Sequence, residues 1–139
     1  MPAGSSIQRS VVNPLVKFAF RHGIPDPGDA LLETIGRRSG HPRVTPVCDG
    51  MQGDTFWVIS ERGRAADWVR NIASEPRVRV GVRRDFRLRW RSGTAHILDD
   101  DDIEERRRIV ARGGLGRGLC VDASQALATD PVTVRIDLD

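Results

Sequence analysis

The chain has 139 residues, enough for one domain with a modest core, and its apolar fraction of 39% is ordinary. Its formal net charge of +3 is mildly basic, which permits an anionic partner without requiring nucleic acid. No apolar run approaches the roughly 20 residues of a membrane-spanning helix, and the N-terminus lacks the apolar core of a signal peptide. A cytoplasmic protein is therefore expected.

The residues that commonly bind metals are scattered. Cys48 and Cys120 lie far apart with no CxxC spacing, so two reduced, unreactive thiols are expected. The three histidines show neither metal nor triad spacing. The acidic run 99–102 suits the start of a helix better than a cation site. No metal site is predicted.

The predicted elements begin after residues 1–12, which are expected to form a flexible tail. Asn13 and Pro14 have the residue types of a helix cap and first turn, and Gly23 ends that helix. The linker IPDPGD follows. Three short apolar segments then predict strands, with the sequences ALLETI, RVTPVCD and DTFWVIS. A helix is predicted over AADWVRNIASE, where Ala65, Trp68, Val69 and Ile72 share a face.

Strict alternation of arginine with apolar residues predicts a β-hairpin over RVRVGVR and DFRLRWR. Its arginines are expected on one face, opposite the apolar side chains: Arg77, Arg79, Arg83, Arg84, Arg87, Arg89 and Arg91. Three explanations remain open: a solvated face, pairing with acidic residues of the run 99–102 or of a second subunit, or binding to nucleic acid or anionic lipid. No aromatic residue is expected among these arginines, which argues against binding of single strands.

The C-terminal part is predicted to contain a helix, a loop and a strand. DDIEERRRIVARGG has acidic residues at its start and arginines toward its end, and Glu104 and Arg108 are spaced to pair. Gly113 is expected to stop this helix, and the glycine-rich segment 113–118 to form a mobile loop over the site. VTVRIDL is the last strand. This order predicts a mainly β (α+β) fold, an antiparallel barrel with helices outside.

A dense cationic turn, GRRSGHPR at 36–43, separates the first two predicted strands. Gly36 and Gly40 permit unusual backbone angles and the close approach of a ligand. The guanidinium groups supply forked donors suited to phosphate, with Ser39 beside them. The turn is either an anion site or a solubilising hairpin turn.

LLETIGRRSGHPRVTPV, followed by DTFWVIS and WVRNIASEPRVRV, resembles the deazaflavin (coenzyme F420)-dependent nitroreductase family. The resemblance covers Leu31 to Thr94, with a weaker match at NPLVKF. It implies one split β-barrel domain over residues 1–139, with six or seven antiparallel strands and two to three peripheral helices. It also implies a coenzyme F420 reductase that forms a homodimer.

The resemblance assigns residues to the coenzyme by matching motifs. Phosphate and tail contacts are implied for the first motif, and ring contacts for the segment SERGRAADW. Trp68 packs either beside the coenzyme or in the core, and Asn71 is expected to tie its helix to a strand. The full set of expected cofactor-binding residues is Arg37, Arg38, Ser39, Gly40, Arg43, Thr45, Pro46, Ser60, Arg62, Gly63 and Trp68.

The expected reaction is hydride transfer from reduced deazaflavin to an activated alkene, a quinone or a nitro compound. The chain contains no tyrosine, so no catalytic residue is named and protonation by solvent is expected. Two alternatives remain: a split barrel that binds FMN, and a non-enzymatic module whose arginine hairpin binds nucleic acid or a membrane surface. For the reductase, no nucleic-acid partner is expected, and peripheral membrane contact is left open.

Overall fold

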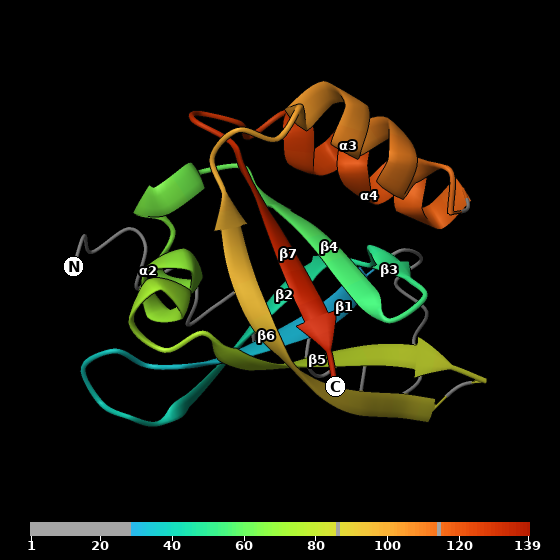
Figure 1. Cartoon of the computed structure of the whole chain (residues 1–139). Helices are drawn as coiled ribbons and strands as arrows, with labels where there is room; N and C mark the ends of the chain where they lie inside the picture. Colours follow the sequence, from blue (N-terminus) through green and yellow to red (C-terminus); the bar gives the residue numbers. More distant parts are fainter. Residues whose placement is uncertain (1–28, 86, 114) are drawn as a thin grey trace.

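The computed structural model describes residues 29–85, 87–113 and 115–139. The expected tail 1–12 and the helix expected after Asn13 lie outside the described residues. One seven-stranded antiparallel sheet carries the strands in the order β2-β1-β5-β6-β7-β4-β3, and it curls on itself (Figure 1). The strands are β1 (Asp29–Ile35), β2 (Pro42–Cys48), β3 (Met51–Gln52), β4 (Thr55–Ser60), β5 (Arg77–Arg84), β6 (Arg87–Leu98) and β7 (Val132–Leu138).

The two edges of this sheet are brought together by the chain itself. β2 is one edge strand and β3 is the other, yet only Asp49 and Gly50 separate them in sequence. The Trp57 amide donates to the carbonyl of Gly50 at 3.0 Å, and a side chain at Gly50 would collide with the Trp57 carbonyl. The sheet is therefore a partly open barrel joined at this corner.

The core fills the inside of the curl because alternate residues of each strand point inward. Its largest fully buried side chains include Phe56, Leu32, Ile136 and Val80. The expected valine face of the hairpin is confirmed, since Val78, Val80 and Val82 all belong to this cluster. Helices lie outside: the short 3₁₀ turn η1 (Gly63–Ala65), α2 (Asp67–Ser74), α3 (Ile103–Ala111) and α4 (Leu115–Gln125).

The register of the β5–β6 hairpin corrects the prediction that its arginines share one face. Gly81 lies opposite Trp90 and Val82 opposite Arg89, and residues opposite each other in a ladder project to the same side of the sheet. Arg87, Arg89 and Arg91 therefore share the valine side, whereas Trp90 lies among the arginines of β5. The guanidinium of Arg79 sits 4.9 Å from the centre of the Trp90 ring, so an aromatic does interleave with the arginines.

Two further expectations in the C-terminal part are wrong. The mobile loop expected at 113–118 is replaced from Leu115 onward by helix α4, which packs beside α3 (Figure 1). The ion pair expected between Glu104 and Arg108 is replaced by two others: Arg108 contacts Glu105 at 2.7 Å, one residue closer along the helix, and Glu104 lies 3.6 Å from Arg107. Asp102 caps α3, accepting a hydrogen bond from the Glu105 amide at 3.1 Å.

Within the described part of the chain, no helix is long and apolar enough to cross a membrane.

Candidate functional site

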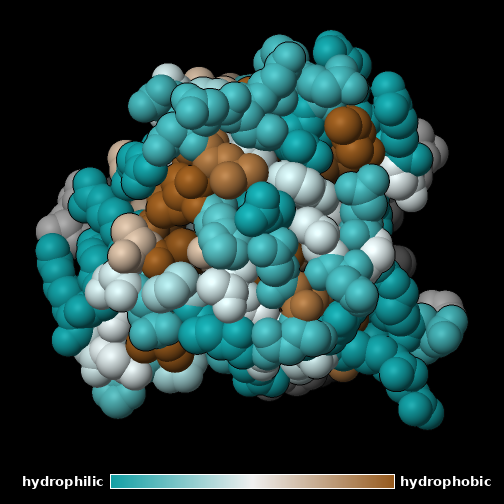
Figure 2. Space-filling view, in the orientation of Figure 1, coloured by the Kyte–Doolittle hydropathy of each residue, from teal (hydrophilic) through white to brown (hydrophobic). Residues whose placement is uncertain are grey.

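A largely apolar pocket of about 500 Å³ lies between the outer face of the barrel and the helices α3 and α4. This volume is within the range of small-molecule and cofactor sites. Apolar side chains form most of its wall, and Figure 2 shows apolar surface gathered toward the end of the barrel that carries these helices. The principal lining residues are Pro46, Val47, Trp57, Ile59, Val110 and Val121.

Four of the expected cofactor residues line this pocket: Pro46, Ser60, Arg62 and Trp68. Ser60 is buried, and its hydroxyl donates to the carbonyl of Gly63 at 2.8 Å, closing the turn after β4. Gly63 has a φ of +59°, and a side chain there would collide with the Asp130 carbonyl. The two residues therefore shape this end of the pocket through the backbone.

The cationic turn joins β1 to β2 and is closed by its own backbone. The Gly36 amide donates to the carbonyl of His41, and the Gly40 amide donates to the carbonyl of Gly36, both at 2.8 Å. Gly40 has a φ of +73°, in the left-handed region that favours glycine. Ser39 accepts from the His41 amide and, at 3.4 Å, from the guanidinium of Arg43.

Arg37 differs from Arg43, whose guanidinium contacts Ser39 of the same turn, because the Arg37 guanidinium is engaged by helix α2. It donates to the side-chain oxygen of Asn71 at 2.9 Å and pairs with Asp67 at 3.2 Å. Asn71 in turn donates to Thr34 at 3.1 Å, which confirms the expectation that it ties α2 to a strand. Arg37 therefore fixes the turn against α2.

Arg38 and Arg43 carry the available positive charge of the turn. Both are exposed, and neither forms an ion pair with any residue of the described ranges. Arg43 stands on β2 only three residues before Pro46, a separation of about 10 Å along an extended strand. Thr45 lies between them and pairs with Leu32 of β1. One strand thus leads from the cationic turn to the apolar pocket.

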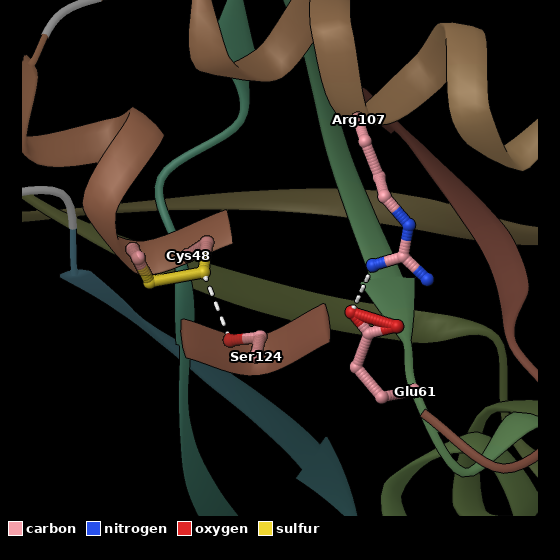
Figure 3. The surroundings of a disulfide bond; sticks show 5 residues. Cys48, Glu61, Arg107 and Ser124 are labelled. Carbon is pink, nitrogen blue, oxygen red and sulfur yellow. Dashed lines mark hydrogen bonds and ion pairs between the residues drawn. A yellow bond between two sulfur atoms is a disulfide. The ribbon is translucent and has the colours of Figure 1, made fainter. Parts of the chain in front are cut away.

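A buried ion pair beside the pocket was missed from the sequence. Arg107 reaches down from α3, and its Nη1 lies 2.5 Å from Oε2 of Glu61, which lines the pocket (Figure 3). The two side chains retain 5% and 12% of their exposure. Because Glu61 follows β4 directly, the pair anchors α3 over the pocket. Glu61 stands in the segment SERGRAADW and Arg107 in the helix predicted over DDIEERRRIVARGG, but nothing in either segment indicates that the two side chains meet.

The disulfide Cys48–Cys120 corrects the expectation of two reduced thiols. It joins the end of β2 to α4 across a separation of 72 residues, with the two Cα atoms 5.8 Å apart (Figure 3). A separation of that length says nothing about proximity, and it is the curl of the sheet that brings α4 onto β2. Cys48 and Ser124 both line the pocket.

Helix α3 also holds the aromatic wall of the pocket. The guanidinium of Arg106 lies 3.5 Å from the centre of the Trp57 ring, a cation–π contact, and Asp101 holds that guanidinium with two hydrogen bonds of 3.1 Å. The Trp57 indole donates to Gln52 at 3.1 Å. The pocket wall therefore depends on a carboxylate that does not itself touch the pocket.

Replacing Asp101 with asparagine should change how stability depends on pH. The hydrogen bonds from Arg106 lower the pKa of Asp101, so its contribution is present above the unfolded value of about 3.9 and is lost as the pH falls through the folded value. The variant should unfold at lower urea than wild type at pH 6, and the difference should narrow at pH 3. Asp100→Asn, at an exposed neighbour, is the control; an equal gap at both pH values would contradict the assignment.

Among the described residues, no group of three or more histidine, cysteine, aspartate or glutamate side chains could hold a metal ion.

The family model described as F420H(2)-dependent quinone reductase matches residues 9–138. An F420H(2)-dependent quinone reductase of Mycobacterium tuberculosis is 31% identical over 65 residues, which cover 44% of each chain. The match thus spans less than half of that relative's length. The family-model match extends well beyond the cationic turn and the pocket strands.

Solved structures show the fold. A structure titled F420-H2 dependent reductase (FDR-A) has a TM-score of 0.55 at 18% identity, covering 83% of this chain and 96% of its own. A heme storage protein from Vibrio cholerae, HutZ, also has a TM-score of 0.55 at 18% identity, covering 91% of this chain and 89% of its own. The expected split β-barrel of the α+β class is confirmed.

Proposed function

The chain belongs to the F420H(2)-dependent quinone reductase family, an oxidoreductase family that uses coenzyme F420, and from this premise we propose its reaction. The protein transfers a hydride from reduced F420 to a quinone; activated alkenes and nitro compounds are the other candidate acceptors. The observation that carries the proposal is that β2 joins the turn that bears the exposed Arg38 and Arg43, neither of which has an ion pair among the described residues, to the apolar pocket.

The donor set fits the phosphate and the ring of this coenzyme. Arg38 and Arg43 offer guanidinium groups at an exposed turn, where charge-assisted hydrogen bonds contribute about 1.5–3 kcal/mol each. Two of them supply a large share of the ~8 kcal/mol of micromolar binding. Pro46, Trp68 and the backbone around Ser60 form the apolar and shaped wall for the ring. When bound, the deazaflavin supplies the hydride.

The residues of the pocket act by orientation and by excluding water. Trp57 and Ile59 keep the ring and the acceptor in one apolar space, so that the two reacting groups meet without a solvation shell between them. The chain has no tyrosine to act as an acid, and protonation of the reduced acceptor by solvent is part of the proposal.

A titration of the purified protein with coenzyme F420 and, separately, with FMN tests the cofactor. Trp57 and Trp68 line the pocket, so their fluorescence should be quenched as the ring enters. We expect a Kd for F420 at or below about 1 µM and a much weaker one for FMN. Tight FMN binding without F420 binding would make the chain an FMN-binding split barrel, and turnover with quinones, enones and nitroarenes would then fail with reduced F420.

The homodimer and peripheral membrane contact remain proposals of the same kind. Leu119 and Leu127, at or just beyond helix α4, keep 60% and 67% of their exposure, and either partner would cover such apolar surface. Light scattering of the purified protein tests for the homodimer, and flotation with anionic vesicles tests for membrane contact.

A further inference from the structure

Helix α4 forms part of the pocket wall but has little apolar packing of its own. Gly116 stands in its first turn, and Gly118 stands farther inside the helix, where a glycine lowers helix stability by about 1 kcal/mol relative to alanine. Leu119 points to solvent, and among the described side chains of the helix only Val121 is buried. Most helices in proteins are stabilised by packing of an apolar face, so α4 depends on other ties.

Helix α4 is held by polar and covalent contacts with the corner where β2 meets β3. Arg117 donates to the carbonyl of Met51 at 3.1 Å and contacts Asp49 at 3.3 Å. The Cys48–Cys120 disulfide is the covalent tie at the same corner. It joins the helix to the strand that lines the pocket, and a disulfide, unlike the other contacts, opens on reduction.

A serine lies beside the Cys48 sulfur of this disulfide. Ser124 Oγ lies 3.4 Å from Cys48 Sγ, and because a sulfur in a disulfide carries no hydrogen, the hydroxyl is the donor (Figure 3). A hydrogen bond to sulfur favours the thiolate form, and a more stable thiolate leaves faster in thiol–disulfide exchange. The hydrogen bond from Ser124 therefore favours the departure of Cys48 as a thiolate.

We propose that the Cys48–Cys120 disulfide is a thiol–disulfide exchange site for dithiol reductants and that its reduction opens the pocket. A thiolate of the reductant bonds to the Cys120 sulfur as the bond between Cys120 and Cys48 breaks, and Cys48 leaves as a thiolate beside Ser124. The second thiol of the reductant then displaces Cys120. The dithiol is oxidised to a disulfide, both cysteines end as thiols, and α4 loses its covalent hold on β2. This inference does not depend on which cofactor the pocket binds.

Hydrogen exchange of the whole protein before and after reduction with dithiothreitol tests the opening. Amides of residues 115–125 should exchange at least about tenfold faster after reduction, because local opening of α4 then costs less, while amides of the central β6 and β7 should stay protected. Quenching of Trp57 and Trp68 by acrylamide should rise in parallel, measured with Trp90→Phe as background. Complete reduction with unchanged α4 exchange and unchanged quenching would overturn the proposal.

The rate of reduction tests the assigned direction of attack. Ser124→Ala should slow the appearance of free thiols with dithiothreitol by about three- to tenfold, the loss expected for one hydrogen bond. Ser92→Ala, at an exposed serine of β6, is the matched control and should reduce at the wild-type rate. A rate in Ser124→Ala that equals or exceeds wild type contradicts the role of Cys48 as leaving group. A Cys48→Ala/Cys120→Ala variant should show the fast exchange of α4 with or without reductant.

Discussion

Replacing Arg38 and Arg43 together with alanine should weaken the binding of coenzyme F420 by at least about a hundredfold, with little change in the free energy of unfolding. Two charge-assisted hydrogen bonds to phosphate are lost, and every 1.4 kcal/mol corresponds to a factor of ten. Neither guanidinium forms an ion pair with the described residues, so folding loses little. Calorimetric titration measures the affinity, and urea unfolding measures the stability.

The control for this pair is Arg87→Ala/Arg89→Ala, which removes the same charge from the exposed hairpin of β5 and β6. Its affinity for the coenzyme should stay within about threefold of wild type, because charges separated by more than a Debye length of ~8 Å are largely screened at physiological salt. Equal losses in the two variants would mean that net charge, rather than the turn, attracts the coenzyme. Arg37→Ala would not serve as a control, because it also releases α2 from the turn.

The second large effect is on stability. Arg107→Leu should lower the free energy of unfolding by about 3–5 kcal/mol, since it leaves the carboxylate of Glu61 buried without its partner. Urea unfolding at pH 7 measures the loss. In the double variant Glu61→Leu/Arg107→Leu most of the stability should return, because two apolar side chains then replace the buried pair.

Arg108→Ala, which removes an exposed ion pair from the same helix, is the control for the buried pair. Its partner Glu105 is exposed, and such surface pairs contribute about 0–1 kcal/mol. A loss in Arg107→Leu no larger than that in Arg108→Ala would show that the Glu61–Arg107 contact does not anchor α3.

Where apolar and charged residues alternate, the strands were predictable from the sequence because alternation reports directly on a half-buried strand, although β6 continues to Leu98, beyond the predicted DFRLRWR. β7 was predicted with its observed ends, and β5 within one residue. The face of each arginine in β6 was not predictable in the same way. A shift of one residue in the pairing of a hairpin moves every side chain to the other face, and alternation within each strand does not fix that pairing. The observed pairing of Gly81 with Trp90 fixes the register and therefore the face on which each β6 arginine lies.

The residues of the candidate site were likewise predictable where they form a local motif and not where they depend on long-range contacts. The cationic turn is a local feature, so its residues could be singled out from GRRSGHPR alone, although the engagement of Arg37 with α2 could not. The opposite wall of the pocket is built from contacts between distant segments: Cys48 with Cys120, and Glu61 with Arg107. The glycines that predicted a loop at 113–118 express only a weak local preference, which tertiary contacts override in α4.

The position of β7 in the sheet has a consequence for how quickly the protein acquires its structure. β7 lies between β6 and β4, and β4 has only the two-residue strand β3 on its other side. The strand that bears Trp57 and leads into Glu61 is therefore docked by residues about half a chain away in sequence. Pairing strands that lie so far apart in sequence costs a large loss of chain entropy before the contacts between them contribute any stability. We therefore expect slow folding, on the millisecond-to-second scale of barrels with non-local pairing, and a wall of the pocket that forms among the last parts of the molecule.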